Sequence, residues 1–423
     1  MSPARRCAFV VVRRVFEQGA YADRAFLGQA RELAPRDRAL AQAIAYGTVQ
    51  RRLTLDHVAR ELIGRPLRRL EPAVLASLRI GLFQLLYLAG VAAHAAVDES
   101  VELVKPASPG GARLVNAVLR RAAREGPPLL ARLHDRDPDS AALRHSVPVW
   151  LAEMWWRELG AEPARALLER VNLPAESALR ANLLLTSAEE VAARVGRRTH
   201  PAPGLPEGLV LEEPFDAHGS DLWREGAIIP QSRGSMLVAR VVSPQAGERV
   251  LDLCAAPGGK TTHLAALMGG SGSVVAVERH PRRAEGLEQT CRRTQASSVR
   301  VVVGDAAEWA SPEDFDRVLV DPPCSGLGTL QSRPDLRWRA SPETIAELAL
   351  QQRAILAAAG RATKPGGTLT YSVCTISQSE GEDQMDRFIQ EQPGFRLEEQ
   401  FQLLPHRDGT DGFFIARLRR ESH

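Results

Sequence analysis

Cysteine is scarce in this chain of 423 residues. The five cysteines are odd in number and widely separated, at Cys7, Cys254, Cys291, Cys324 and Cys374. This distribution excludes a disulfide framework and the closely spaced ligands of a zinc site. We therefore expect reduced thiols, no metal and a cytoplasmic location.

Long uncharged runs are equally scarce. The first apolar run is short and is interrupted by Arg13 and Arg14, which argues against a signal peptide. Residues 80–97 are uncharged for the length of a membrane span, but Gln84, His94 and many small residues favour a pair of buried helices. We expect a soluble protein without a membrane partner.

Lysine is almost absent. Of 54 basic residues only three are lysines, at Lys105, Lys260 and Lys364. A lysine that remains in such a chain is a candidate for a role that needs a compact ammonium group. Residues 1–130 carry a net charge of +9 and the remainder −6. The basic part is either a surface that attracts polyanions or a well-solvated arginine-rich helical surface.

The chain reads as three domains. Apolar residues at three- and four-residue spacing predict an all-helical domain over 1–130. Gly126 is expected at a helix end, and the polar, proline-bearing stretch 124–140 is expected to be a linker. Mixed patterns predict a small α+β domain over 140–235. Alternating strand and helix patterns predict a parallel α/β domain over 236–423.

In the last of these domains, four β-rich runs end in polar or reactive side chains, namely Cys254, Glu278, Asp305 and Asp321. Ligands bind beyond the carboxyl ends of parallel strands, so we expect these side chains to converge on one crevice. In "LDLCAAPGGKTTHL", Gly258 and Gly259 allow close backbone approach before a helix. The loop lacks G-x-x-x-x-G-K-[ST], which disfavours a nucleotide-phosphate site, and the strand-end pattern favours S-adenosylmethionine over NAD.

The motifs "VDPPCSGLGTL" and "YSVCT" place Cys324 and Cys374 just past neighbouring strands of this crevice. A single buried cysteine is usually inert, but two in such positions indicate chemistry. Carbon 5 of a pyrimidine is a poor nucleophile until a thiolate adds to C6. Methylation at C5 then needs a nucleophilic cysteine, an acid near N3 and a group that assists release of the sulfur. Cys374, Asp321 and Cys324 fit these requirements, and their spacing leaves open which cysteine attacks.

Several motifs together resemble the Sun/Nop2 (RsmB-type) ribosomal RNA cytosine-5 methyltransferases: "LDLCAAPGGKTTHLAAL", "VDPPCSGLGTL", "RPDLRWR", "TKPGGTLTYSVCT" and "DGFFIARL". "LVNAVLRRA" at 114–122 resembles part of a NusB-like RNA-binding domain. The resemblance covers nearly the whole chain. It implies a NusB-like helical domain, a Rossmann-like class I methyltransferase domain, and methyl transfer from S-adenosylmethionine to C5 of a cytosine in 16S ribosomal RNA.

The resemblance also implies roles for individual residues. Cys374 is the nucleophile and Cys324 helps to release the product. Glu278 binds the ribose, Asp305 lies near the adenine and Asp321 lies near the methionine end of the cofactor. The implied cofactor loop comprises Cys254, Ala255, Ala256, Pro257, Gly258, Gly259 and Lys260.

Two positions of this loop region carry further expectations. Lys260 is a candidate to orient Asp321. Ser232 stands where the family usually has an aspartate, which changes local cofactor or loop contacts.

RNA recognition requires an unpaired or flipped-out cytosine, because a base inside a stem cannot reach a thiol in a crevice. Arg333, Arg337 and Arg339 are candidate phosphate contacts or form a solvated arginine loop. One alternative function is the same chemistry on transfer RNA or another ribosomal site. A second is a catalytically weak NusB-like RNA-binding assembly factor. We expect a monomer.

Overall fold

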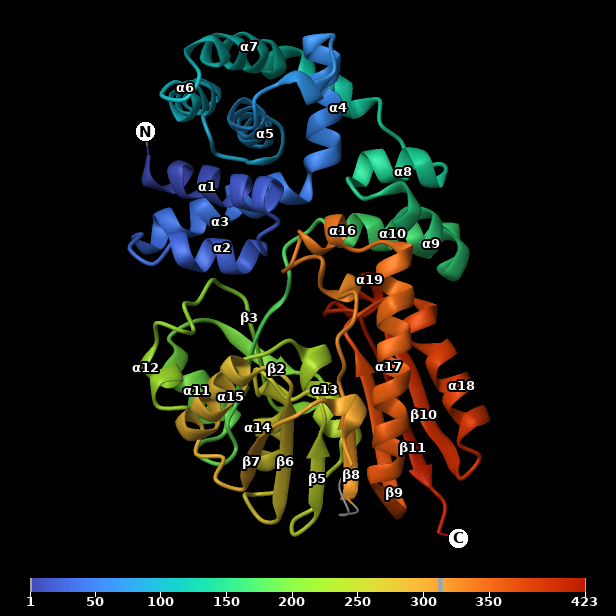
Figure 1. The fold of residues 1–423 in the computed structure, drawn as a ribbon. Coiled ribbons are helices and arrows are strands. Elements are labelled where there is room, and N and C mark those ends of the chain that lie inside the picture. Colours follow the sequence, from blue (N-terminus) through green and yellow to red (C-terminus); the bar gives the residue numbers. More distant parts are fainter. Residues whose placement is uncertain (1, 311–314, 423) are drawn as a thin grey trace. The chain divides into compact units, whose positions relative to one another are not determined.

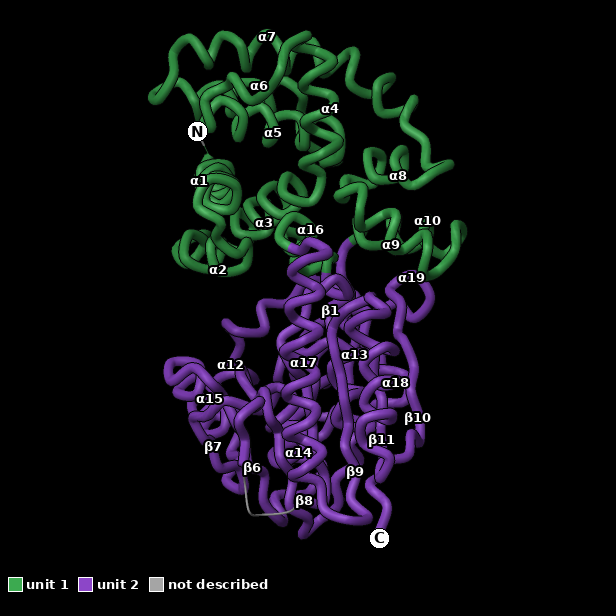
Figure 2. The backbone as a smooth tube through the Cα atoms, turned by 45° about the vertical axis from the view of Figure 1, so that its right-hand side comes forward, with its two compact units in different colours: residues 1–173, 330–339 green, residues 174–329, 340–423 purple. Residues whose placement is uncertain are grey.

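The computed structural model describes residues 2–310 and 315–422 and divides into two compact units (Figure 2). Unit 1 comprises residues 1–173 and 330–339, and unit 2 comprises residues 174–329 and 340–423. The stretch predicted as one α+β domain is therefore divided. Its first helices belong to unit 1, whereas its strands belong to unit 2.

The described residues of unit 1 form helices and loops. Ser2 and Ser108 begin two of the helices by accepting hydrogen bonds from backbone N–H groups, as N-cap residues do. The helices are α1 (Pro3–Gln18), α2 (Ala22–Gln29), α3 (Pro35–Gln50), α4 (Arg52–Ile63), η1 (Leu67–Arg69), α5 (Pro72–Tyr87), α6 (Ala93–Val104), α7 (Pro109–Ala131), α8 (Pro138–His145), α9 (Val149–Leu159), α10 (Ala161–Arg170) and α16 (Leu336–Arg339).

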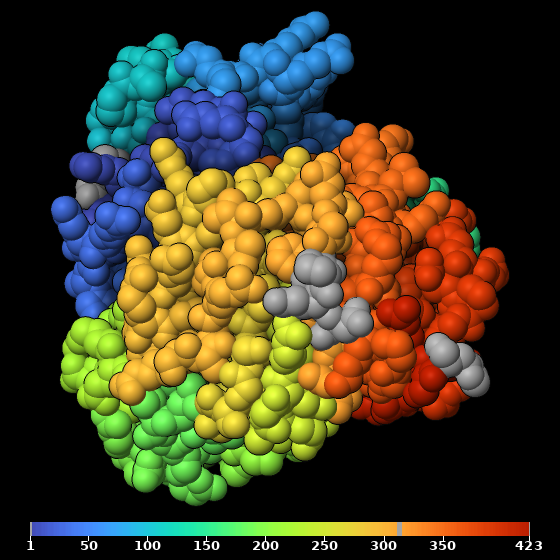
Figure 3. All heavy atoms as spheres, turned by 60° about the horizontal axis from the view of Figure 1, so that its bottom comes forward, coloured from blue at the N-terminus to red at the C-terminus, as the bar shows by residue number. Residues whose placement is uncertain are grey.

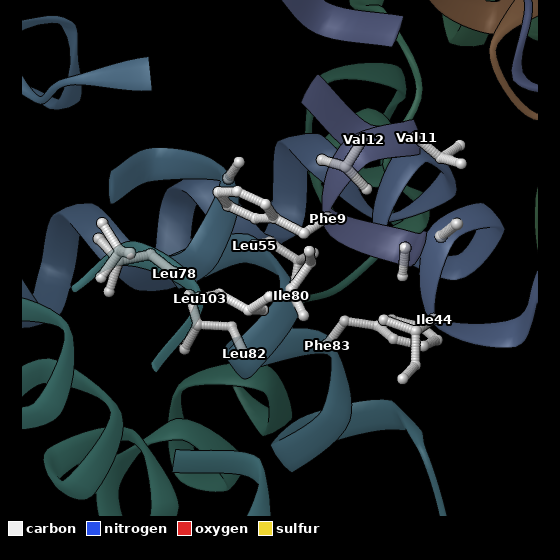
Figure 4. Packing of buried hydrophobic residues seen from close by; sticks show 14 of the residues in the cluster. Phe9, Val11, Val12, Ile44, Leu55, Leu78, Ile80, Leu82, Phe83 and Leu103 are labelled. Carbon is white, nitrogen blue, oxygen red and sulfur yellow. The ribbon is translucent and has the colours of Figure 1, made fainter. Parts of the chain in front are cut away.

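The core of unit 1 forms where the apolar faces of its N-terminal helices meet. Figure 4 shows Phe9 of α1, Leu55 of α4 and Phe83 of α5 within this cluster. Burial of such side chains stabilises a fold by about 25 cal/mol per Å² of apolar surface. The all-helical domain predicted for this part of the chain is confirmed.

The long uncharged run at 80–97 spans two helices, as expected, but only its α5 part is well buried, because Ala93 and His94 at the start of α6 are exposed. It covers the end of α5 and the start of α6, and most of α5 is buried, including Gln84. The Gln84 side chain accepts a hydrogen bond from Arg5 and donates one to the carbonyl oxygen of Ile80. Among the described helices, none has the length and apolar character needed to cross a bilayer.

The prediction of a helix end at Gly126 is wrong. Helix α7 continues through Gly126, Pro127 and Pro128 to Ala131. A Cβ atom at position 126 would lie 2.6 Å from the Leu86 side chain, so the glycine serves close packing rather than helix termination.

Unit 2 contains two sheets. The four-stranded sheet has the order β2–β3–β1–β4, and all its pairs are antiparallel. Its strands are β1 (Ser177–Ala181), β2 (Thr199–Ala202), β3 (Leu205–Leu211) and β4 (Ile228–Pro230). The helices of unit 2 are α11 (Ala188–Val195), α12 (Asp221–Arg224), α13 (Arg233–Val242), α14 (Gly259–Leu267), α15 (Pro281–Arg293), η2 (Ala306–Glu308), η3 (Leu327–Thr329), α17 (Pro342–Ala362), η4 (Gln378–Glu380), α18 (Glu382–Glu391) and α19 (Pro405–Asp408).

The seven-stranded sheet has the order β10–β11–β9–β8–β5–β6–β7. Five neighbouring strands are parallel, as the sequence predicts: β5 (Arg249–Asp252), β6 (Ser273–Glu278), β7 (Val299–Val303), β8 (Phe315–Val320) and β9 (Thr363–Val373). Two strands that the sequence analysis missed, β10 (Phe395–Leu403) and β11 (Phe413–Arg420), add an antiparallel edge. The expected Rossmann-like α/β fold is confirmed.

Helices cover both faces of this sheet (Figure 1). Successive strand residues point to opposite faces, so Leu251 and Val318 pack in a cluster with α17 and α18, whereas Val250 and Leu319 pack in a cluster with α13, α14 and α15. In the space-filling view of Figure 3, the red residues near the C-terminus lie on the right of the visible face, and the gold residues lie at its centre and left.

Candidate active site

The cofactor loop connects β5 to the N-terminus of α14. Gly258 has φ +103°, and a Cβ atom there would lie 2.6 Å from Leu287 Cδ1, so only glycine fits this turn. Helix α14 begins at Gly259, where backbone N–H groups without helical partners face the loop. The sequence therefore builds a close-approach turn at the carboxyl edge of β5.

A cavity of about 270 Å³ opens beside this loop. It is lined by residues 254–257, Gly259 and Lys260 of the predicted loop and by Asp321 after β8. The structure thus brings most of the predicted cofactor residues together. Glu278 and Asp305 are not lining residues of this cavity.

Glu278 and Asp305 have protein partners. Glu278 is buried, accepts a hydrogen bond from the backbone N–H of His280 at 2.9 Å and lies 3.5 Å from Arg283. Asp305 caps η2 by accepting from the N–H of Ala307 at 3.0 Å. Their predicted contacts with ribose and adenine remain predictions.

Asp252, the last residue of β5, is a site residue that the sequence analysis missed. Its side chain lines the cavity although the residue is only 1% exposed. One oxygen, Oδ2, accepts a hydrogen bond from Thr261 at 2.7 Å, whereas Oδ1 is buried and has no hydrogen-bond partner among the described residues. Burial raises the pKa of Asp252 to about 6. An unpaired buried oxygen at a cavity wall can be satisfied by a donor on a bound ligand.

Lys260 pairs with Asp321 across this cavity. Its Nζ lies 2.7 Å from Asp321 Oδ2, and Ser372 donates to Asp321 Oδ1 at 2.9 Å. Burial disfavours the charged ammonium, but the negative charge of Asp321, helped by Cys374 and Asp252, outweighs it and raises the pKa of Lys260. Lys260 therefore contacts Asp321 directly, and its predicted role in orienting this carboxylate remains a prediction.

The two cysteines lie beyond the carboxyl ends of the neighbouring strands β8 and β9. The Cys324 sulfur lies 3.4 Å from the Cys374 sulfur, within hydrogen-bonding distance for thiols. The loops that carry them follow β8 and β9, which are paired in parallel. The hydrogen bond to Cys374 and burial both raise the pKa of the Cys324 thiol well above its usual range. Either thiol could donate across this contact, and the predicted roles of the two cysteines remain predictions.

Arg180 of β1, also missed by the sequence analysis, fixes the cofactor loop from the smaller sheet. It is fully buried, donates to Gln231 Oε1 at 2.8 Å, and donates to the Gly259 carbonyl oxygen at 3.2 Å and to Thr262 Oγ1 at 3.0 Å. Charged groups are rarely buried without such partners, and one such residue in a strand gives no sequence signal of its own.

Ser232 has a defined role in the structure. Its hydroxyl oxygen accepts a hydrogen bond from the N–H of Ser235 and so caps helix α13 beside the cavity. Serine and aspartate are nearly equivalent N-cap residues. The replacement of the family's usual aspartate therefore preserves the helix start.

The three arginines predicted to contact phosphate all lie in unit 1. Arg333 and Arg339 are half-buried, with their guanidinium groups over the Tyr21 ring at 5.9 and 3.9 Å. Arg337 is fully buried, which contradicts its predicted role as a phosphate contact. Its guanidinium donates to Asn172 Oδ1 and to carbonyl oxygens, including those of Ser146 and Val171. Arg337 is a packing residue.

Comparison with known proteins matches both parts of the chain. The family described as 16S rRNA methyltransferase RsmB/F matches residues 239–419, and the NusB family matches residues 2–124. The probable ribosomal RNA small subunit methyltransferase B of Synechocystis sp. is 37% identical over 449 residues, which cover 99% of this chain and 100% of that protein.

Two solved structures are also similar. The crystal structure of PH0851 has a TM-score of 0.83 and 26% identity, with 99% of each chain covered. The crystal structure of NSun6 from Pyrococcus horikoshii with SFG has a TM-score of 0.60 and 25% identity, covering 64% of this chain and 98% of that one.

Proposed function

The chain belongs to the family of 16S rRNA methyltransferases RsmB/F, and we propose that it transfers a methyl group from S-adenosylmethionine to C5 of a cytosine in 16S ribosomal RNA. The reaction proceeds through a covalent bond between Cys374 and C6 of the base. The observation that carries this proposal is the 3.4 Å separation of the Cys324 and Cys374 sulfurs at the edge that also holds the Lys260–Asp321 pair.

The residues around the cavity suit the cofactor. The turn at Gly258 allows close backbone approach, and the unpaired oxygen of Asp252 would accept a hydrogen bond from a donor such as a protonated amino group. A relative of known structure was crystallised with SFG, an analogue of S-adenosylmethionine. When bound, S-adenosylmethionine supplies an electrophilic methyl group. Loop residues 254–257, Gly259 and Lys260 would hold it, with Asp321 near its methionine end and Glu278 and Asp305 toward the nucleoside.

The chemistry on the base assigns a separate role to each thiol. The Cys374 thiolate adds to C6, and the Lys260–Asp321 pair supplies a proton at N3, so that C5 becomes an enamine carbon that attacks the methyl group. Water then takes the C5 proton, N3 returns its proton to the Lys260–Asp321 pair, and the C6–sulfur bond breaks so that its electron pair leaves with the Cys374 sulfur as thiolate. The Cys324 thiol, a neutral donor next to the departing sulfur, stabilises the thiolate that is released.

Two measurements test which RNA is the substrate and how it is bound. Unit 1 contains the NusB match and much of the basic charge, so its contribution to RNA affinity should fall with rising salt. The decisive assay incubates the protein with methyl-labelled S-adenosylmethionine and 16S ribosomal RNA, or transfer RNA as comparison, and identifies the labelled nucleoside. We expect label in 5-methylcytidine from 16S ribosomal RNA. Label on an exocyclic nitrogen, or RNA binding without any transfer, contradicts the proposal.

A further inference from the structure

Glu380 is a buried carboxylate that hydrogen-bonds to the loops of both cysteines. Its residue is 0% exposed. Oε1 accepts from the backbone N–H of Ser325 at 2.9 Å, and Oε2 accepts from Ser325 Oγ at 2.5 Å and from Thr375 Oγ1 at 3.3 Å. Ser325 directly follows Cys324 and Thr375 directly follows Cys374. One carboxylate therefore holds the residue next to each thiol.

Further hydrogen bonds fix Glu380 itself. Gln352 Nε2 donates to Oε1 at 3.0 Å and also to the Pro323 carbonyl oxygen at 2.9 Å. The Tyr371 hydroxyl donates to the Glu380 carbonyl oxygen at 2.7 Å. Among the residues that the structure describes, no cationic side chain forms a salt bridge with Glu380. A carboxylate buried without a cation is costly, and its donors here come largely from the segments that carry the two thiols.

We propose that Glu380 is a positioning residue that holds the Cys324 and Cys374 sulfurs at the separation the reaction needs. The inference rests on the proposed function, in which both sulfurs act on one pyrimidine ring. Reacting groups displaced by about 1 Å can lose about 100-fold in rate, so a shared anchor for the two loops has a direct effect on turnover. The anchor acts through hydrogen bonds to Ser325 and Thr375, and Glu380 itself touches neither substrate nor cofactor.

The chain offers graded variants and a matched control. In E380Q the amide oxygen can still accept from the two N–H donors, while its NH₂ group faces two hydroxyls that can rotate to accept. E380Q therefore keeps the anchor and removes the charge. E380D shortens the side chain by one methylene and E380A removes the anchor. E382Q makes the same chemical change as E380Q at an exposed position two residues away.

The first measurement requires no RNA. Diamide oxidises two neighbouring thiols to a disulfide and takes up their two hydrogens, and the Cys324–Cys374 bond formed can be quantified by mass spectrometry of peptides. We expect wild type, E382Q and E380Q to form this bond at rates within about twofold of one another. E380D and E380A should react about tenfold more slowly because their thiols spend less time in contact.

The second measurement separates kcat from KM in methyl transfer to 16S ribosomal RNA. We expect E380A to lose about 100-fold in kcat, with KM for RNA and the Kd for S-adenosylmethionine within about twofold of wild type, and E380Q to restore most of kcat. If E380A fails to fold, E380D replaces it in the comparison. We then expect E380D to have a lower kcat than wild type and an unchanged Kd for S-adenosylmethionine.

The outcomes separate this inference from the proposed function. Wild-type rates of both oxidation and turnover in E380A and E380D overturn the positioning role. Loss of turnover in E380Q equal to that in E380A also overturns it, because the charge rather than the anchor would then matter. If wild-type protein transfers no methyl group, the proposed function fails, while the oxidation rates still decide whether Glu380 holds the sulfurs together.

Discussion

The Lys260 ammonium lies 2.7 Å from Asp321, and this contact joins the cofactor loop to the end of β8. Ser372 of β9 donates to the other oxygen of the same carboxylate. Three strand ends of the parallel sheet thus converge on one charge pair. The proposed mechanism assigns this pair both to the methionine end of the cofactor and to N3 of the base.

Replacement of Lys260 should lower activity whichever residue is introduced. K260M removes the ammonium beside Asp321, and K260R introduces a planar, bulkier guanidinium at a site only 14% exposed. We expect both variants to lose about 100-fold in kcat/KM for methyl transfer, the usual cost of removing an electrostatic donor from an active site. K364M, which removes a lysine paired with Asp316, is the matched control and should retain wild-type kcat/KM. An active K260R would show that any cation suffices.

The raised pKa of Asp252 makes stability depend on pH. Its ordinary pKa is 3.8 and its folded-state pKa is about 6, so between these values only the folded state holds the proton. Protonated Asp252 therefore adds to the free energy of unfolding below pH 3.8, and this contribution is lost as the pH rises through 6. The total loss is about 3 kcal/mol. Asparagine at this position cannot ionise. The free energy of unfolding of wild type, minus that of D252N, should therefore fall from pH 4 to pH 7 in denaturant titrations. Parallel pH curves for the two proteins would contradict the assignment.

Arg337 should matter for stability. R337M leaves the Asn172 side-chain oxygen and several buried carbonyl oxygens without their donor, which should lower the free energy of unfolding by about 3 kcal/mol. Burial lowers the pKa of Arg337 to about 9, so its guanidinium remains charged at neutral pH. Denaturant unfolding measures the effect.

R333M is the control for this position, because Arg333 is half-buried over Tyr21. We expect R333M to change the free energy of unfolding by about 0.5 kcal/mol or less and to reduce the salt slope of RNA binding by about one. If R333M and R337M lower the free energy of unfolding equally, the buried hydrogen bonds of Arg337 add no stability beyond that of a half-buried arginine.

Much of the fold could be predicted from sequence patterns. The five parallel strands have strong β-rich runs, and ligands bind beyond the carboxyl ends of such strands. Of the four strand-end residues expected to share one crevice, Cys254 and Asp321 line the cavity, whereas Glu278 and Asp305 do not. The antiparallel strands β10 and β11 were missed, because β10 is half-buried and carries several charged and polar residues. The helix end predicted at Gly126 was wrong because glycine occurs both at helix ends and where helices pack closely.

Burial and hydrogen-bond partners could not be predicted. Arg337 lies in "RPDLRWR", where neighbouring arginines resemble a basic loop, yet its guanidinium faces carbonyl oxygens inside unit 1. Asp252 lies inside the motif "LDLCAAPGGKTTHLAAL" and Glu380 lies six residues after Cys374, but neither carboxylate stands out in the sequence. Their importance follows from an unpaired oxygen in Asp252 and from shared donors in Glu380. Such relationships depend on residues far apart in the chain.

Trapping the protein–RNA adduct tests the central claim most directly. C374A and C324A proteins are incubated with S-adenosylmethionine and 16S ribosomal RNA, and covalent complexes are resolved by denaturing electrophoresis. We predict no adduct and no turnover for C374A, and an adduct that accumulates for C324A because attack proceeds while release fails. An adduct formed by C374A but absent from C324A would reverse the roles of the two sulfurs and contradict the account.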